Sequence, residues 1–343
     1  MGGDADTATY RGRMRRGVTI VMACVAIPVA LAGCASAPLG QPPSRSSPAT
    51  PSSTITHPPP PTTTHPSTSA PSKAVTPAAP IRLSLSRGGF TILGHYRLLA
   101  YYGAYGTAQL GVLGSADPED IADDIVARAG DYAQYGEPVY PTMELIATVA
   151  RATPGADGQY STPVPAETVQ RYLDVAHRNK MLLLLDIQPG RGEFLPQVEL
   201  FEQFLRDPSV SVALDPEWKV GPGQVPATVI GSSSAGSVEA IADYLSALVA
   251  RYHLPDKLLM VHEFTPPMLP DREAIVPRPG VEVAFHADGF GGQSAKLATW
   301  ERLAFPGRPY GTGFKLFLTQ DTDLMSPDEV MALHPRPDIV TYQ

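Results

Sequence analysis

From residue 81 to its last residue, the chain alternates short apolar runs with amphipathic segments. Runs such as MLLLLDI, residues 181–187, are apolar on both faces, which is what parallel strands covered by helices require. The runs predict strands at 98–102, 139–144, 181–187, 210–215, 257–263, 281–286, 314–319 and 339–342.

Between these runs, apolar residues recur at helical spacing, and several segments begin with helix-start residues. Asp117-Pro118 supplies a cap followed by a first-turn proline, and Ser326 to Glu329 forms a capping-box sequence. The expected helices are 118–134, 165–179, 195–205, 237–252, 294–303 and 327–333. The link around 267–275 is expected to be short and irregular.

Strands alternating with helices over some 260 residues predict a (β/α)8 TIM-type barrel. No helix is predicted after the eighth strand, so the barrel either lacks its last helix or uses residues 81–95 to cover that position. A doubly wound open sheet is the alternative fold. It has less support, because bulky tyrosines in YYGAYG, 101–106, occupy the place of a glycine-rich phosphate loop.

The first 33 residues have the composition of a lipoprotein signal peptide. Arg11 to Arg16 supply positive charge, an apolar stretch follows, and the segment ends in Leu31-Ala32-Gly33-Cys34. This ending resembles the lipobox of bacterial lipoproteins. The resemblance implies cleavage before Cys34 and acylation of Cys34, with chains such as palmitate anchoring the protein to the extracytoplasmic face of the cell membrane.

Residues 34–80 are rich in Pro, Ser and Thr and contain few apolar residues, which predicts a disordered tether between Cys34 and the barrel domain at 81–343. The chain has two cysteines, Cys24 and Cys34, so no disulfide is expected in the barrel domain. The net charge is −8 and no basic patch is visible, which argues against nucleic-acid binding.

Polar and aromatic residues gather where the predicted strands end. Active sites of TIM-type barrels lie at the carboxyl ends of the strands, so these residues are expected to meet around one opening. The expected substrate-binding residues are Tyr101, Tyr102, Glu144, Asp186, Trp218, His262, His286, Asp288 and Tyr342.

Asp215 ends the fourth predicted strand, and Glu217 follows it by two positions in the sequence LDPEW. Side chains two positions apart in a strand share a face, so both are expected at the barrel mouth. Two close carboxylates repel one another when both are ionised, so one is held protonated. A protonated acid beside an ionised one is the arrangement that cleaves glycosidic bonds.

The Asp-x-Glu at this position resembles two groups of TIM-barrel glycoside hydrolases, the lysozyme-like muramidases and the chitinase-like families. The resemblance implies that Glu217 is the proton donor and that Asp215 assists it. It covers only these residues and the fold pattern. The chain has tyrosines where the muramidases have an acid on the first strand, and it lacks the further upstream Asp residues of the chitinases.

The resulting hypothesis is a membrane-anchored glycoside hydrolase-like protein that acts on a cell-envelope polysaccharide and needs no cofactor or metal. Glu263 or Asp321 is the expected second catalytic carboxylate. Three alternatives stay open. Asp215 and Glu217 could pair with a cation such as Lys315, the barrel could be a non-catalytic glycan-binding or scaffold module, or His262, His286 and Asp288 could help to bind a metal in a metal-dependent hydrolase.

Overall fold

The computed structural model describes residues 81–305 and 307–343. The expectations for the signal peptide, for Cys34 and for the tether all concern residues 1–80 and lie outside this range.

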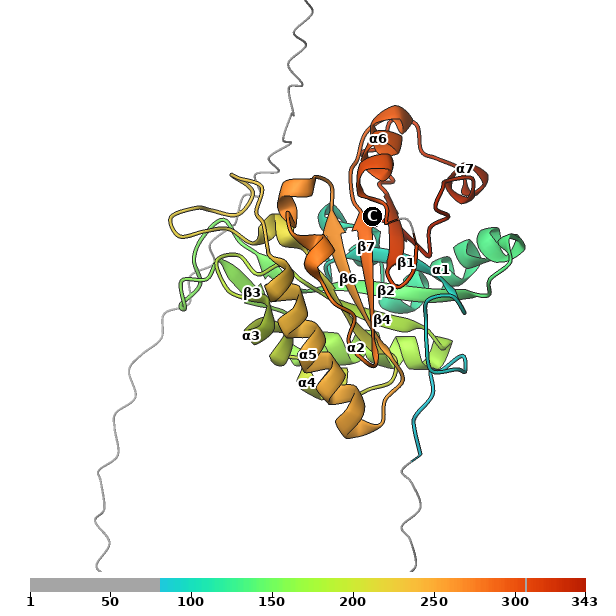
Figure 1. Ribbon diagram of the computed structural model, residues 1–343, viewed down its shortest axis with the longest axis horizontal. Coiled ribbons are helices and arrows are strands. Elements are labelled where there is room, and N and C mark those ends of the chain that lie inside the picture. Colours follow the sequence, from blue (N-terminus) through green and yellow to red (C-terminus); the bar gives the residue numbers. More distant parts are fainter. Residues whose placement is uncertain (1–80, 306) are drawn as a thin grey trace, which may run out of the picture. The chain divides into compact units, whose positions relative to one another are not determined.

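Eight parallel strands close into a TIM-type barrel, which confirms the predicted fold (Figure 1). The neighbours around the barrel follow the chain order, and β1 pairs with both β2 and β9 to close it. The barrel strands are β1 (Arg97–Gly103), β2 (Val139–Ala150), β4 (Leu182–Ile187), β5 (Val210–Leu214), β6 (Lys257–Glu263), β7 (Val281–Ala287), β8 (Gly311–Leu316) and β9 (Ile339–Tyr342).

Two strands differ from the predicted pattern. The short strand β3 (Ser161–Pro163) pairs antiparallel with the long end of β2. Strand β8 begins and ends three residues earlier than expected, at Gly311–Leu316 instead of 314–319. Its first half has glycines in place of apolar residues. A Cβ on Gly311 would lie 2.7 Å from the Leu93 side chain, so the glycine leaves room for that residue inside the barrel.

Helices connect most of the strands, and their starts follow the expected chemistry. Asp117 caps α1 by accepting from the Glu119 amide, and Ser326 and Glu329 form the predicted capping box of α7. The expected helix at 195–205 is divided into α3 and α4. The helices are α1 (Pro118–Tyr132), α2 (Ala166–Asn179), α3 (Phe194–Glu199), α4 (Glu202–Leu205), α5 (Ala235–Tyr252), α6 (Gln293–Leu303) and α7 (Pro327–Met331).

Short 3-10 turns complete the connections. The irregular link predicted between β6 and β7 contains two of them, η5 and η6. In the described stretch 307–343 no helix follows β9. The turns are η1 (Ala108–Leu110), η2 (Val112–Gly114), η3 (Ala133–Tyr135), η4 (Pro216–Trp218), η5 (Pro266–Met268) and η6 (Arg272–Ala274).

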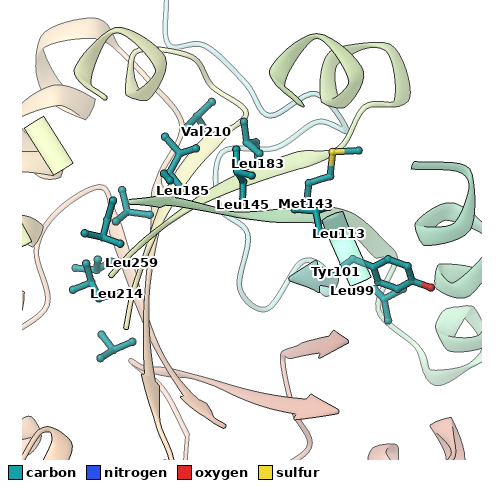
Figure 2. Close-up of a cluster of buried hydrophobic side chains, with 14 of the residues drawn as sticks. Leu99, Tyr101, Leu113, Met143, Leu145, Leu183, Leu185, Val210, Leu214 and Leu259 are labelled. Atoms are coloured by element: carbon teal, nitrogen blue, oxygen red, sulfur yellow. The ribbon is translucent and has the colours of Figure 1, made fainter. Parts of the chain in front are cut away.

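Alternation along each strand separates an outer core from an inner one. On β4, Leu183 and Leu185 face the helices and belong to the large outer cluster (Figure 2). Leu182 and Leu184 point into the barrel and join a smaller inner cluster. Each fully buried leucine of this kind contributes about 1.5–3 kcal/mol. The same alternation places Asp186 inside the barrel, one step closer to its carboxyl end.

The segment before β1 fills the amino end of the barrel and does not form a helix over β9. Its residues Leu85, Ile92 and Leu93 belong to the inner cluster. The carboxylate of Glu282 on β7 accepts from the backbone amides of Ile92 and Leu93, at 2.6 and 3.0 Å. This floor leaves the carboxyl end as the place where polar side chains gather.

Candidate active site

The inner positions nearest the carboxyl ends of the strands carry polar side chains on nearly every strand. All of them are buried, with at most 7% of any residue exposed. They come from β1, β2, β4, β6, β7, β8 and β9 and from the residues that follow β4, β5 and β7. The group consists of Tyr102, Glu144, Asp186, Gln188, Asp215, His262, His286, Asp288, Lys315 and Thr341.

Two carboxylates share the hydroxyl of Tyr102. Its oxygen lies 3.1 Å from Asp186 Oδ2 and 3.1 Å from Asp215 Oδ2. Gln188 Nε2 donates to the same hydroxyl at 3.0 Å and to Asp215 at 3.3 Å. A phenol has one hydrogen to donate, so one carboxyl group must itself carry a proton. Burial, and then the charge of Asp215, raise the pKa of Asp186 well above its usual value, so Asp186 holds that proton.

His262 on β6 lies between two acids. Its Nε2 is 2.7 Å from Glu144 Oε1 and its Nδ1 is 3.0 Å from Asp288 Oδ2. Both ring nitrogens must donate, which requires the imidazolium form. Burial opposes this charge, but Glu144 and the hydrogen bond to Asp288 raise the pKa of His262 well above its usual value. His262 is therefore a fixed positive charge in the barrel.

Lys315 on β8 is the second buried cation. Its Nζ lies 3.1 Å from Asp288 Oδ2 and 3.6 Å from the centre of the Tyr102 ring. Burial disfavours the charge of Lys315, but Asp288 and the other acids raise its pKa. Burial likewise disfavours the charge of Asp288, but Lys315 and His262 lower the pKa of this carboxyl group. Asp288 is thus ionised, with both cations on its Oδ2.

His286 on β7 is the neutral histidine of the group. Its Nε2 donates to Thr341 Oγ1 at 2.9 Å, and Thr341 donates to Glu144 at 3.4 Å. Burial, and then the charge of His262, lower the pKa of His286 well below its usual value. A Cβ on Gly313 would lie 2.2 Å from the His286 ring, so this glycine of β8 makes the space for the imidazole.

Glu217 lies at the edge of this buried group and is partly exposed. Pro216 starts the turn η4 directly after Asp215, so Glu217 sits on a 3-10 turn, and the strand alternation that was expected to place it on the same face as Asp215 does not apply to it. Burial, and then the charges of Asp215 and Asp288, raise the pKa of Glu217 well above its usual value. Among the described residues, no side chain donates a hydrogen bond to this carboxyl group.

Three buried polar atoms at the mouth have no hydrogen-bond partner among the described residues: Asp186 Oδ1, Asp215 Oδ1 and His286 Nδ1. Buried polar atoms are usually paired, and unpaired ones in one place suggest a polar ligand. The indole nitrogen of Trp218, next to Glu217, is also unpaired.

The structure brings together eight of the predicted residues: Tyr102, Glu144, Asp186, Asp215, Glu217, His262, His286 and Asp288. Trp218 is the next residue after Glu217 on η4, and its indole nitrogen makes no hydrogen bond to this group. The structure does not bring in Tyr101 and Tyr342, which lie in the outer core against the helices (Figure 2 shows Tyr101). The rings of these two tyrosines pack edge to face, 6.1 Å apart.

Neither proposed second carboxylate faces the mouth. Glu263 is one residue after His262 and therefore points outward, where Arg272 Nη1 lies 3.4 Å from its carboxylate. The Asp321 side chain is fully buried beside Lys296, at 3.1 Å, and accepts from the amides of Gly291 and Phe317, both at 2.9 Å. Glu263 and Asp321 support loops and helices outside the barrel mouth.

Gln188 and Thr341 were not singled out from the sequence, and Lys315 was expected only as a partner of Asp215 and Glu217. Strand alternation could have identified two of them as inward-facing. Gln188 follows the inward-facing Asp186 by two positions, and Lys315 follows the inward-facing Gly313 by two. The relation between Gly313 and Lys315 was not visible in the sequence because β8 was predicted three residues too late.

A metal site was one of the alternatives that the sequence left open. In residues 81–305 and 307–343, no group of three or more His, Cys, Asp or Glu side chains is arranged to hold a metal ion. No helix in the same ranges is long and apolar enough to cross a membrane.

In comparisons with known proteins, no family model and no curated protein matches this chain.

Proposed function

We propose that this protein is a glycoside hydrolase with Glu217 as its general acid. The observation that carries the proposal is the position of Glu217. It is partly open to solvent on the turn that directly follows a barrel strand, and burial and the neighbouring acids raise the pKa of its carboxyl group well above the usual value. A carboxyl group kept protonated near neutral pH can give its proton to the leaving oxygen of a glycosidic bond.

Asp215 is the ionised partner in this proposal. Burial raises its pKa, but less than that of Asp186, because the charges of His262 and Lys315 and the hydrogen bond from Tyr102 oppose the shift. Tyr102 and Gln188 hold its Oδ2, while its Oδ1 is buried without a hydrogen-bond partner among the described residues and would accept from a substrate hydroxyl or amide that reached it. Its negative charge would also stabilise the positive charge that develops on the sugar in the transition state. Asp186, Tyr102 and Gln188 act through Asp215 by fixing its orientation.

The remaining charges support this arrangement. Lys315 and His262 offset Asp288 and Glu144, so the buried acids do not all repel Glu217 with full charge. Asp186 and His286 stay neutral next to them. The mouth therefore combines one proton donor, one free carboxylate oxygen and a fixed surrounding field.

The substrate is proposed to be a polysaccharide of the cell envelope. The support is the lipobox-like Leu31 to Cys34 and the Pro/Ser/Thr-rich stretch that separates it from the barrel. Lipidation of Cys34 would keep the barrel at the extracytoplasmic face of the membrane. Replacement of Cys34 by alanine is expected to release the protein from the membrane fraction, and retention of the variant there would contradict the anchor.

Glu217→Gln tests the catalytic proposal. Loss of the proton donor is expected to lower kcat by about 10²–10⁴-fold on a cleaved envelope polysaccharide, with the unfolding midpoint unchanged. The matched control is Glu193→Gln, which removes a rim carboxylate that pairs with Lys219 at 2.7 Å. Full activity of Glu217→Gln, or an equal loss of kcat in Glu217→Gln and Glu193→Gln, would contradict the assignment of Glu217 as the general acid.

One observation favours a second candidate, a non-catalytic glycan-binding barrel. His262, Lys315 and the acids around them form a largely closed ion network, and most of the group is less than 5% exposed. In that case the unmodified protein binds envelope glycans but releases no reducing ends from them. A reducing-end assay on the unmodified protein therefore separates the two candidates.

A further inference from the structure

Phe290 is an exposed aromatic residue on the loop that follows Asp288. It is 54% exposed, in the sequence Gly289-Phe290-Gly291-Gly292 between β7 and α6. Its ring meets the buried ring of Phe317 edge to face at 5.7 Å and 68°. The contact fixes one edge of Phe290 and leaves much of the ring open to solvent.

Two buried charged side chains hold the loop that carries Phe290. Asp321 accepts from the Gly291 amide and from the Phe317 amide, both at 2.9 Å. Lys296 pairs with Asp321 at 3.1 Å and donates to the carbonyls of Gly289 and Lys315, both at 2.7 Å. We call these two residues the loop clamp.

The loop clamp places an ion pair where water is excluded. Its side chains are at most 1% exposed, and desolvation of such a pair costs several kcal/mol for each charge, which its contacts must offset. A glycine-rich loop without such contacts would have wide conformational freedom. The clamp fixes Phe290 in one position, and an exposed aromatic ring held in place is what a stacking surface requires.

A hollow next to the loop clamp indicates the chemical class of the ligand. The residues just after Phe317 form one wall of a hollow of about 170 Å³ at the carboxyl ends of β1, β8 and β9. Its wall includes amide and hydroxyl side chains together with aliphatic ones. The polar members are Gln109, Ser115, Thr319, Gln320 and Gln343. The accessible surface of the hollow is mostly apolar and its polar groups are uncharged, which suits a neutral ligand that has both C–H faces and hydroxyl groups.

We propose that Phe290 is a carbohydrate-binding platform on which a sugar ring of a neutral glycan stacks, held in place by the loop clamp. This inference deepens the proposed function, since it names a binding position for the same glycan on the β7–β8 side of the mouth. Glu217 lies at the end of β5, two strands away from β7 around the barrel. The platform would bind a part of the glycan distinct from the unit that is cleaved.

The test is glycan binding to the full-length chain carrying Glu217→Gln, which removes turnover. The probes are chitotetraose, cellotetraose and mannotetraose, and isothermal titration gives Kd. Phe290→Ala is expected to raise Kd about tenfold for any probe that binds, which is about 1.4 kcal/mol. Phe290→Trp, which keeps an aromatic ring at this position, should bind with a Kd close to that of the protein with Phe290. The matched control is Phe90→Ala, since Phe90 is 44% exposed in the segment before β1.

The outcomes separate the platform from the catalytic proposal. Binding that depends on Phe290, in a protein that never cleaves glycans, supports the platform and overturns the hydrolase. Cleavage with equal Kd values for Phe290→Ala and Phe90→Ala overturns the platform and leaves Glu217 in place. The platform also falls if none of the three tetrasaccharides binds, or if Phe290→Ala acts by dissociating a dimer of this chain.

Discussion

The two ends of the barrel interior are built from the same strands but with opposite chemistry. At the amino end, Leu182 and Leu184 pack with Ile92 and Leu93 in an apolar floor. At the carboxyl end, two residues further along β4, Asp186 enters a group of buried acids and cations. On β4, therefore, the inward-facing side chain at position 184 stabilises the fold, and the next inward-facing one, at position 186, belongs to the candidate site.

The difference lies in how completely each end satisfies its polar groups. The floor contains one carboxylate, Glu282, and both its oxygens accept backbone amides. The mouth contains three buried polar atoms without a described partner, on Asp186, Asp215 and His286. Unpaired buried groups destabilise a protein unless a ligand completes them. The floor therefore stabilises the barrel, whereas the unpaired atoms of the mouth lower its stability unless a ligand completes them, as the proposed function expects.

The largest expected effect on stability is at the floor. Leu184 is fully buried, so Leu184→Ala is expected to lower the free energy of unfolding by about 2–5 kcal/mol through lost burial and a cavity. Urea unfolding measures the change. Binding at the mouth should be retained at temperatures where the variant is folded. A loss below about 1 kcal/mol would contradict the view of the floor as the stabilising end.

A smaller effect is expected from pH at Glu282. Burial raises the pKa of Glu282 to about 7, against the hydrogen bonds from Ile92 and Leu93. A raised pKa favours the folded state at low pH, where the group is protonated, so this contribution is lost as pH rises from about 4.5 through about 7. The unfolding free energy of the unmodified protein, relative to Glu282→Gln, should therefore fall by on the order of 2 kcal/mol between pH 5 and pH 8. A constant or rising difference would contradict this sign.

The smallest effect is expected at the mouth itself. Asp186 already holds a proton, so Asp186→Asn keeps the shape and the neutral charge of the side chain. The unfolding free energy at pH 7 should change by less than about 1 kcal/mol, since no favourable charge is removed. Thermal unfolding alongside Leu184→Ala checks the contrast within β4. A loss as large as that of Leu184→Ala would show that the two ends do not differ in the proposed way.

Much of the fold followed from local patterns, because each depends on residues close in the chain. Apolar runs such as 181–187 marked buried parallel strands, and Asp117-Pro118 and Ser326 to Glu329 marked helix starts. The convergence of Tyr102, Glu144 and Asp186 followed from the general property that parallel strands end on one face.

What the sequence could not decide was which of two neighbouring residues points inward. Tyr101 and Tyr102 are chemically alike, and His262 and Glu263 are both titratable, so composition could not choose between them. The closed barrel decided it, because pairing with both neighbours fixes the parity of each strand. Pairing on both sides turned Tyr102 and His262 inward and left Tyr101 and Glu263 outside.

The sequence by itself determined the alternation of strands and helices and the set of polar strand ends. Only the tertiary structure decided that Lys315 pairs with Asp288, that His262 is charged while His286 is neutral, and that Asp321 clamps a loop. The physical reason is distance along the chain. Local patterning acts over a few residues, whereas the charge of each buried group depends on partners brought together from strands up to nearly 200 residues apart.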